Sequence, residues 1–128
     1  MERIRQLIDV KGHPCWTLFD SGARNSYITE DAAKGLTIEP IEIQMTFALG
    51  GRKHQIANVC IVHASVEGNP VQVQANVVDE IGKDEYGRTF DMIFGAIAMQ
   101  HWGIKLDVPN EKLDLTHITH DFVEFTEV

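Results

Sequence analysis

The segment Phe19-Asp20-Ser21-Gly22-Ala23 places a carboxylate directly after an apolar run that starts at residue 15. The glycine two positions later can turn the chain without steric cost. A charge at the end of a buried strand is unfavourable unless its neighbours satisfy it, and such positions are where a pKa can be shifted for catalysis. The same residue types are common in surface turns. By itself the segment therefore indicates either a catalytic loop or an ordinary turn.

The chain on both sides of this segment reads as short strands separated by turn residues, which is typical of an all-β, barrel-like domain. Helices are expected only at Ala96–Trp102, stopped by Gly103, and from a Thr29 cap to Gly35. A polar loop is expected over 79–90. The predicted strands are residues 3–10, 15–19, 41–49, 54–62, 71–78, 92–94, 104–108 and 112–115.

Length and charge restrict the class of protein. The 128 residues predict a single domain, 1–128, that is large enough for its own core, with 44% hydrophobic and 23% charged residues. The formal net charge of −8 argues against nucleic acid as a partner. Neither a membrane-spanning apolar run nor a signal-peptide core is evident, so we expect a cytoplasmic protein without a membrane partner.

The two cysteines, Cys15 and Cys60, both lie in apolar, strand-like runs. They are expected to be reduced core thiols, as is usual in the cytoplasm, and a disulfide between them is the less favoured alternative. A catalytic cysteine would need an exposed, activated thiolate. His117 and His120 are three residues apart but lack a third ligand at metal spacing. We therefore expect neither a metal nor a cofactor.

Three features in order resemble the retropepsin-like aspartic proteases, the superfamily of retroviral and retrotransposon proteases. They are the Asp20-Ser21-Gly22 loop with its extended continuation to Ile28, a hairpin tipped by Gly50-Gly51, and Ile93-Phe94-Gly95 leading into a short helix. The resemblance covers about residues 4–116 and implies a closed β-barrel with a flap hairpin. Ser21 replaces the threonine that is more usual in viral enzymes but keeps its hydroxyl. Ala96-Ile97 stands where many relatives carry a polar or longer residue.

The chemistry that this family performs needs two carboxylates that share one proton. One carboxylate is ionised and takes a proton from water, while the protonated one donates to the scissile carbonyl. The chain contains one Asp-Ser-Gly segment, so the resemblance implies a homodimer with Asp20 from each subunit on the two-fold axis. The expected substrate is a peptide or protein.

The resemblance also assigns roles to the residues near Asp20. Ser21 would brace the loop through a hydrogen bond to the partner chain, and Gly22 would let the two loops approach. Ala23 and Arg24 would line the edge of the cleft. The flap over 47–53 would contribute the substrate-binding residues Phe47, Ala48, Leu49, Gly50 and Gly51.

An inactive relative is the alternative. Such a protein would keep the dimeric fold and use its cleft to bind a peptide, or would dimerise another assembly. In either case the apolar tail, Phe122–Phe125, is expected to cross the two-fold axis or to pack beside it, because an unpaired apolar edge would favour aggregation.

Overall fold

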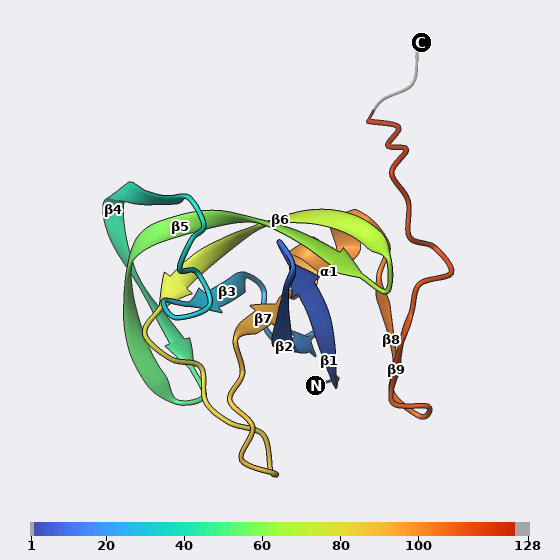
Figure 1. Ribbon diagram of the computed structural model, residues 1–128, viewed down its shortest axis with the longest axis horizontal. Coiled ribbons are helices and arrows are strands. Elements are labelled where there is room, and N and C mark those ends of the chain that lie inside the picture. The colour runs from blue at the N-terminus through green and yellow to red at the C-terminus, as the bar shows by residue number, and fades with distance from the viewer. Residues whose placement is uncertain (1, 125–128) are drawn as a thin grey trace.

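The computed structural model describes residues 2–124 (Figure 1). Within this range the protein is mostly strand with one short helix, as the sequence predicted. No helix among these residues is long and apolar enough to cross a membrane. The elements are β1 Arg3–Val10, β2 His13–Asp20, β3 Ser26–Thr29, β4 Ile38–Leu49, β5 Arg52–Val66, β6 Asn69–Val78, β7 Met92–Phe94, α1 Ala96–Trp102, β8 Lys105–Asp107 and β9 Lys112–Asp114.

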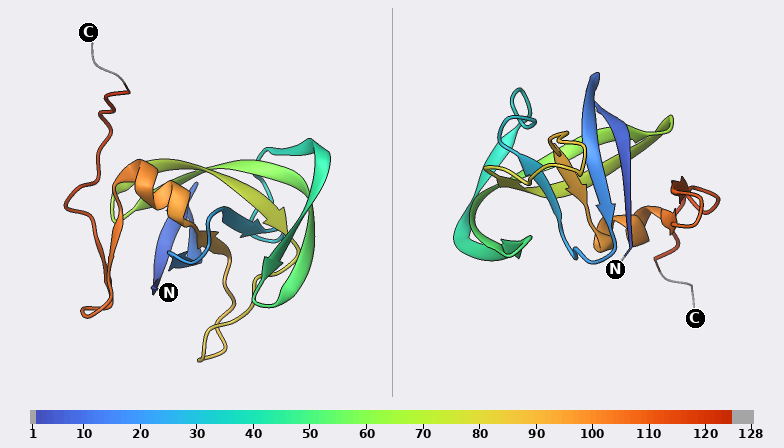
Figure 2. Two further views of the ribbon diagram at one scale, coloured as in Figure 1. Left: turned by 180° about the vertical axis from the view of Figure 1, so that it is seen from behind. Right: turned by 90° about the horizontal axis from the view of Figure 1, so that it is seen from below.

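Seven of the strands form one strongly curved sheet, in the order β1-β2-β7-β3-β6-β5-β4. β1 also pairs with β5, through Asp9↔Ser65 and Val10↔Ala64, so the sheet bends round to meet its own first strand (Figure 2). β4 continues beyond this contact as a free edge, and β8 with β9 forms a separate hairpin. These pairings do not establish a closed barrel, which stays a prediction.

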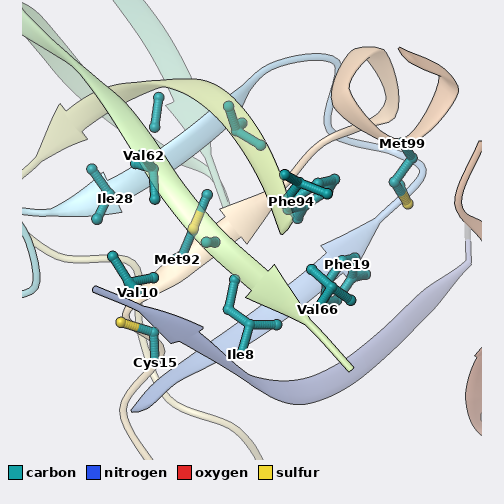
Figure 3. Packing of buried hydrophobic residues seen from close by; sticks show 14 of the residues in the cluster. Ile8, Val10, Cys15, Phe19, Ile28, Val62, Val66, Met92, Phe94 and Met99 are labelled. Carbon is teal, nitrogen blue, oxygen red and sulfur yellow. The ribbon is translucent and has the colours of Figure 1, made fainter. Parts of the chain in front are cut away.

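The core lies inside the curve of the sheet (Figure 3). Phe19 of β2 stacks on Phe94 of β7, with ring centroids 4.8 Å apart, and neither side chain is exposed. In β6 the buried Val71 and Val73 alternate with exposed residues, as expected for a strand with one face on the core. All four residues of β3 are buried, because β3 lies between β6 and β7. The strand that follows the Asp20 loop is therefore held on both edges.

The predicted helix at 96–102 is confirmed, and Gly103 ends it in the left-handed conformation at φ 74°. The helix predicted from Thr29 to Gly35 is wrong, because this segment forms turns. Thr29 makes the expected cap, accepting from Ala32 N at 3.1 Å, and Ala33 N bonds to Thr29 O at 2.9 Å. Gly35, at φ 85°, ends the segment after so few residues that a helix cannot propagate.

The hairpin of β4 and β5 is longer than predicted, and Gly50-Gly51 forms its tip as expected. Both glycines have positive φ, 57° and 80°, which the tight turn requires. The register of β4 against β5 shifts between Pro40 and Met45, so the predicted alternation over 41–49 is interrupted. Most β4 residues are exposed because β4 is an edge strand.

The tail follows the β8–β9 hairpin and runs away from the sheet (Figure 1). Phe122 stacks on His101 of α1 at 4.7 Å, and residues 121–124 form no strand in the chain as described. The remainder of the predicted interface segment, from Phe125 onward, lies outside the described residues. Its expected place at a two-fold axis stays a prediction.

Cys15 and Cys60 are both free and buried, which confirms the interpretation as core thiols. Burial raises the pKa of Cys15 to about 11, with Asp91 and Asp9 adding to the shift. The neutral thiol is thus favoured in the fold. Its stabilising contribution is present below the ordinary thiol pKa and is lost as the pH rises toward 11.

We therefore predict that native Cys15 resists iodoacetamide at pH 8, since the attacking species is the thiolate. Mass spectrometry after a timed exposure should show both thiols modified in denaturant and Cys15 unmodified in the native protein. Equal modification rates in the two states would contradict the burial of this thiol.

Candidate active site

Asp20 is the last residue of β2, and its side chain is nearly buried, with 7% of the residue exposed. Gly22 N donates to its Oδ1 at 2.8 Å, and Arg3 Nε lies 3.6 Å from its Oδ2. Arg3 reaches this position because the β1–β2 register pairs it with Asp20. Both carboxylate oxygens therefore have a polar partner, a backbone N–H on one side and a guanidinium on the other.

The loop after Asp20 is held in place by the start of α1. Ala96 N donates to Ala23 O at 2.7 Å, and Ile97 N donates to Arg24 O at 3.1 Å. The first N–H groups of a helix have no partner within the helix, so the loop carbonyls satisfy them. Gly95 N donates to the buried Ser26 Oγ at 3.0 Å. The loop after Asp20 and the start of α1 thus hold each other in place.

This contact requires Gly95. A Cβ at this position would lie 2.2 Å from Asn25 O and 2.9 Å from Ala23 O, both of which are backbone atoms. The requirement is for a close approach of two backbones, since Gly95 does not have positive φ. The sequence motif Ile93-Phe94-Gly95 therefore has a steric cause.

Ser21 ties the loop to the start of the chain. Its N donates to Glu2 O at 3.0 Å, its hydroxyl accepts from Glu2 N at 3.0 Å, and the hydroxyl donates to Glu2 O at 3.2 Å. The hydroxyl that the sequence singled out as a brace is thus used within its own chain. Its predicted hydrogen bond to a partner chain stays a prediction.

A cleft of about 560 Å³ brings the Asp20 loop and the flap hairpin together. Eight of the ten predicted site residues line it, namely Asp20, Gly22, Ala23, Arg24, Phe47, Ala48, Leu49 and Gly50. Ser21 and Gly51 are not among the lining residues. The sequence reasoning missed Arg3, Leu18, Asn25, Tyr27, Ile81, Gly82, Lys83, Phe90 and Ile93.

Apolar side chains form part of the cleft wall, and Tyr27, Phe47 and Ile93 belong to a second hydrophobic cluster apart from the main core. The ring of Phe47 meets that of Tyr27 edge-on at 5.8 Å. Ile93 is adjacent to Phe94, and the alternation of a strand turns one side chain to the cleft and the other to the core. This alternation is the sequence pattern from which the place of Ile93 in the cleft could have been predicted. Asp20 is the only carboxylate among the lining residues within the described range.

Ion pairs and a hydrogen bond connect the flap hairpin to the residues that follow β6. The Nη2 of Arg52 lies 2.9 Å from Asp79 Oδ2, and Arg52 also pairs with Glu80. The Nδ1 of the buried His54 lies 2.9 Å from Asp79 Oδ1. The pKa of Asp79 is lowered, first by the Glu80 backbone N–H and then by His54 and Arg52, which together outweigh desolvation. Asp79 therefore stays ionised in mild acid, and its contacts are lost only as the pH falls through this lowered value.

A family model described as aspartyl protease matches residues 8–97, which is more than half of the chain. The chain belongs to the aspartyl protease family. The matched range includes the Asp20 loop, the flap hairpin and Gly95. Among curated proteins, none matches the sequence significantly.

Two solved structures have a similar fold. The retroviral protease-like domain of Ddi1 from Leishmania major is 16% identical, with a TM-score of 0.65, and the match covers 92% of this chain and 91% of that domain. The EIAV protease complexed with the inhibitor HBY-793 is 22% identical, with a TM-score of 0.56 and coverage of 82% and 92%. The protein thus has a retropepsin-like fold, and together with the family match this confirms the resemblance drawn from the sequence.

The helix–loop contact yields a prediction for Gly95→Ala. The added methyl group must displace the 23–25 backbone, so we expect a loss of about 1–3 kcal/mol in the free energy of unfolding. NMR shifts should change at the amides of the Asp20 loop. Ile97→Ala, on the half-exposed neighbouring position, is the control and should change stability by only about 0.5 kcal/mol. Equal stability losses in the two variants, measured by urea unfolding, would contradict the steric requirement.

Proposed function

We propose that the protein is an aspartic endopeptidase that acts as a homodimer, with one Asp20 from each subunit. The observation that carries this proposal is a nearly buried carboxylate that lines one cleft, of about 560 Å³, together with a glycine-tipped hairpin. The family match supports it. A single carboxylate cannot serve as both acid and base in this mechanism, so a second copy of the chain must supply the other.

In the proposed reaction the two Asp20 carboxyl groups share one proton, because like charges at that separation cannot both ionise. The ionised group takes a proton from water, which attacks the scissile carbonyl, and the protonated group donates to the carbonyl oxygen. The tetrahedral intermediate then collapses: the first carboxyl group gives its proton to the leaving amine nitrogen as the C–N bond breaks, and the second takes a proton back from a hydroxyl of the intermediate. Gly22 N, at 2.8 Å from Oδ1, orients the carboxylate for this exchange. The absence of a side chain at Gly22 lets two such loops come close.

The proposed substrate is an extended peptide with apolar side chains near the scissile bond. Tyr27, Phe47 and Ile93 would pack against those side chains, and Ala23 with Arg24 would lie at the edge of the cleft. The hairpin from Phe47 to Lys53 would close over the peptide and exclude water. Gly50 and Gly51 would give the tip the freedom to close. We further propose that the enzyme is a single domain and works in the cytoplasm.

A catalytic dimer makes the decisive experiment simple. Asp20→Asn keeps an acceptor for Gly22 N but removes the charge, so cleavage of a casein or peptide-library substrate should fall by about 10²- to 10⁴-fold. Assays should run from about pH 4 to 7, the range in which paired carboxylates titrate as a unit. Asp31→Asn, at an exposed turn, is the matched control and should retain full activity.

Sedimentation of the same samples should show a dimer for the wild type and both variants. Cleavage by a monomer would refute the mechanism, and equal turnover by wild type and Asp20→Asn would refute the role of Asp20. A dimer that binds peptide but does not cleave it would favour the alternative, in which the cleft serves as a peptide-binding or dimerisation module.

The tail gives a separate prediction. If residues 121–128 form part of the subunit interface, their deletion should weaken association and abolish activity, because an obligate interface is large and apolar. The Asp20 loop should remain intact, as judged by its amide NMR shifts. A truncated protein that stays dimeric would refute the role proposed for the tail.

A further inference from the structure

The loop between β6 and β7 is built around Asp84. The Oδ1 of Asp84 accepts from Tyr86 N at 2.8 Å and from Arg88 N at 2.9 Å. Its own N donates to Arg88 O at 2.9 Å, and a bridge pairs Lys83 with Thr89. Desolvation opposes ionisation of Asp84, but the hydrogen bonds outweigh it and its pKa is lowered. The polar loop predicted over 79–90 is thus confirmed, with most of its residues exposed, and the contacts of Asp84 and one isolated bridge give it a defined turn.

Trp16 of β2 anchors this loop to the sheet. Its Nε1 donates to Asp84 Oδ2 at 3.0 Å, and its ring is stacked with that of Phe90. The guanidinium of Arg88 lies over the same ring, with Cζ 4.2 Å from the centroid. An arginine stacked on an aromatic face keeps its N–H donors in the plane of the guanidinium, where they can bind a carboxylate through two bonds.

The loop and β1 enclose a recess of about 420 Å³, separate from the cleft described above. Tyr86, which is 85% exposed, lies at its rim. Arg5 in this recess is paired with Glu85, whereas no carboxylate within residues 2–124 forms an ion pair with Arg88. The recess is lined by Arg3, Ile4, Arg5, Trp16, Asp84, Tyr86, Arg88 and Glu111.

The recess and the catalytic cleft are neighbours. Arg3 lines both, and the 79–90 loop is their common wall, with Gly82 and Lys83 facing the cleft and Tyr86 and Arg88 facing the recess. A peptide that leaves the cleft past Arg3 would therefore meet Arg88. Figure 2 shows this loop, in yellow to gold, standing out beside the first two strands.

We propose that this recess binds an acidic side chain of the substrate peptide, at a position outside the residues held in the cleft. The inference rests on the proposed peptidase function and adds to it a preference for Asp or Glu flanking the cleavage site. Arg88 is the binding group, Trp16 positions its guanidinium, and the hydroxyl of Tyr86 can donate to the same carboxylate. Asp84 and Glu111 also line the recess, and Arg3 and Arg5 pair with Asp20 and Glu85, so on a chain with net charge −8 Arg88 is the group that gives an acidic peptide a place to bind.

The test uses pairs of peptides that differ only by Glu or Gln at one position, with that position moved outward from an apolar centre. We expect one position at which wild type prefers Glu by about three- to tenfold in kcat/KM. This preference should shrink at high salt, because the recess is open to solvent. Arg88→Met should bring the ratio close to one, and Arg88→Lys should retain part of it. Lys34→Met removes the same charge at a distant exposed turn and should keep the wild-type ratio.

Binding of the same labelled peptides to Asp20→Asn, measured by fluorescence anisotropy, separates this proposal from the proposed catalysis. A Glu preference in binding without any cleavage by wild type would support the recess and refute the peptidase. Cleavage with no Glu preference at any position would refute the recess alone. A Glu preference that survives Arg88→Met would also overturn the assignment.

Discussion

The contact between the first turn of α1 and the 23–26 loop is the constraint on which the candidate active site depends. The loop carbonyls accept hydrogen bonds from helix N–H groups that have no partner within the helix. The loop backbone lies so close to Gly95 that no side chain fits at this position. β7 pairs with β2, which precedes Asp20, and leads into α1, which contacts the loop that follows Asp20. The residues on both sides of Asp20 are therefore held by the continuous segment of β7 and α1. The position of the carboxylate is therefore set by packing on two sides, which is how a catalytic group is kept preorganised.

The same constraint explains why the short segment around Phe19 and Asp20 contributes both to the core and to the cleft. Phe19 stacks on Phe94 and directly precedes Asp20, so the core and the proposed catalytic residue are adjacent in the sequence. A charge next to a fully buried phenylalanine is tolerable only because Gly22 N and Arg3 satisfy it. In the proposed dimer a second carboxylate would replace part of the solvent that now reaches Asp20.

Local patterns predicted most of the strands, α1 and eight of the residues that line the cleft, because turn glycines and alternation act over a few residues. The turn at 30–36 was predicted as a helix, since its cap at Thr29 is genuine and only the short distance to Gly35 prevents a helix. Arg3 and Tyr27 were missed because their position depends on strand register, which joins distant parts of the chain. The anchor of the predicted 79–90 loop was missed for a similar reason: Trp16, which donates to Asp84, is 68 residues away from it.

The stretch from Asp79 to Phe90 has a place in the proposed mechanism that its polar sequence does not reveal. Asp79, the first residue of this stretch, contacts Arg52 and His54 of the flap hairpin. Asp84, in the middle of the stretch, accepts a hydrogen bond from Trp16 of β2. The first attachment combines two contacts. The Arg52–Asp79 pair is half exposed and such pairs contribute little, whereas the contact of the buried His54 with Asp79 is shielded from solvent. The loop around Asp84 has several backbone hydrogen bonds and an indole partner, so it stays fixed. In the proposed peptidase, movement of the flap would change one wall of the cleft, while the contacts of Asp84 would hold the loop wall and the geometry around Asp20 in place.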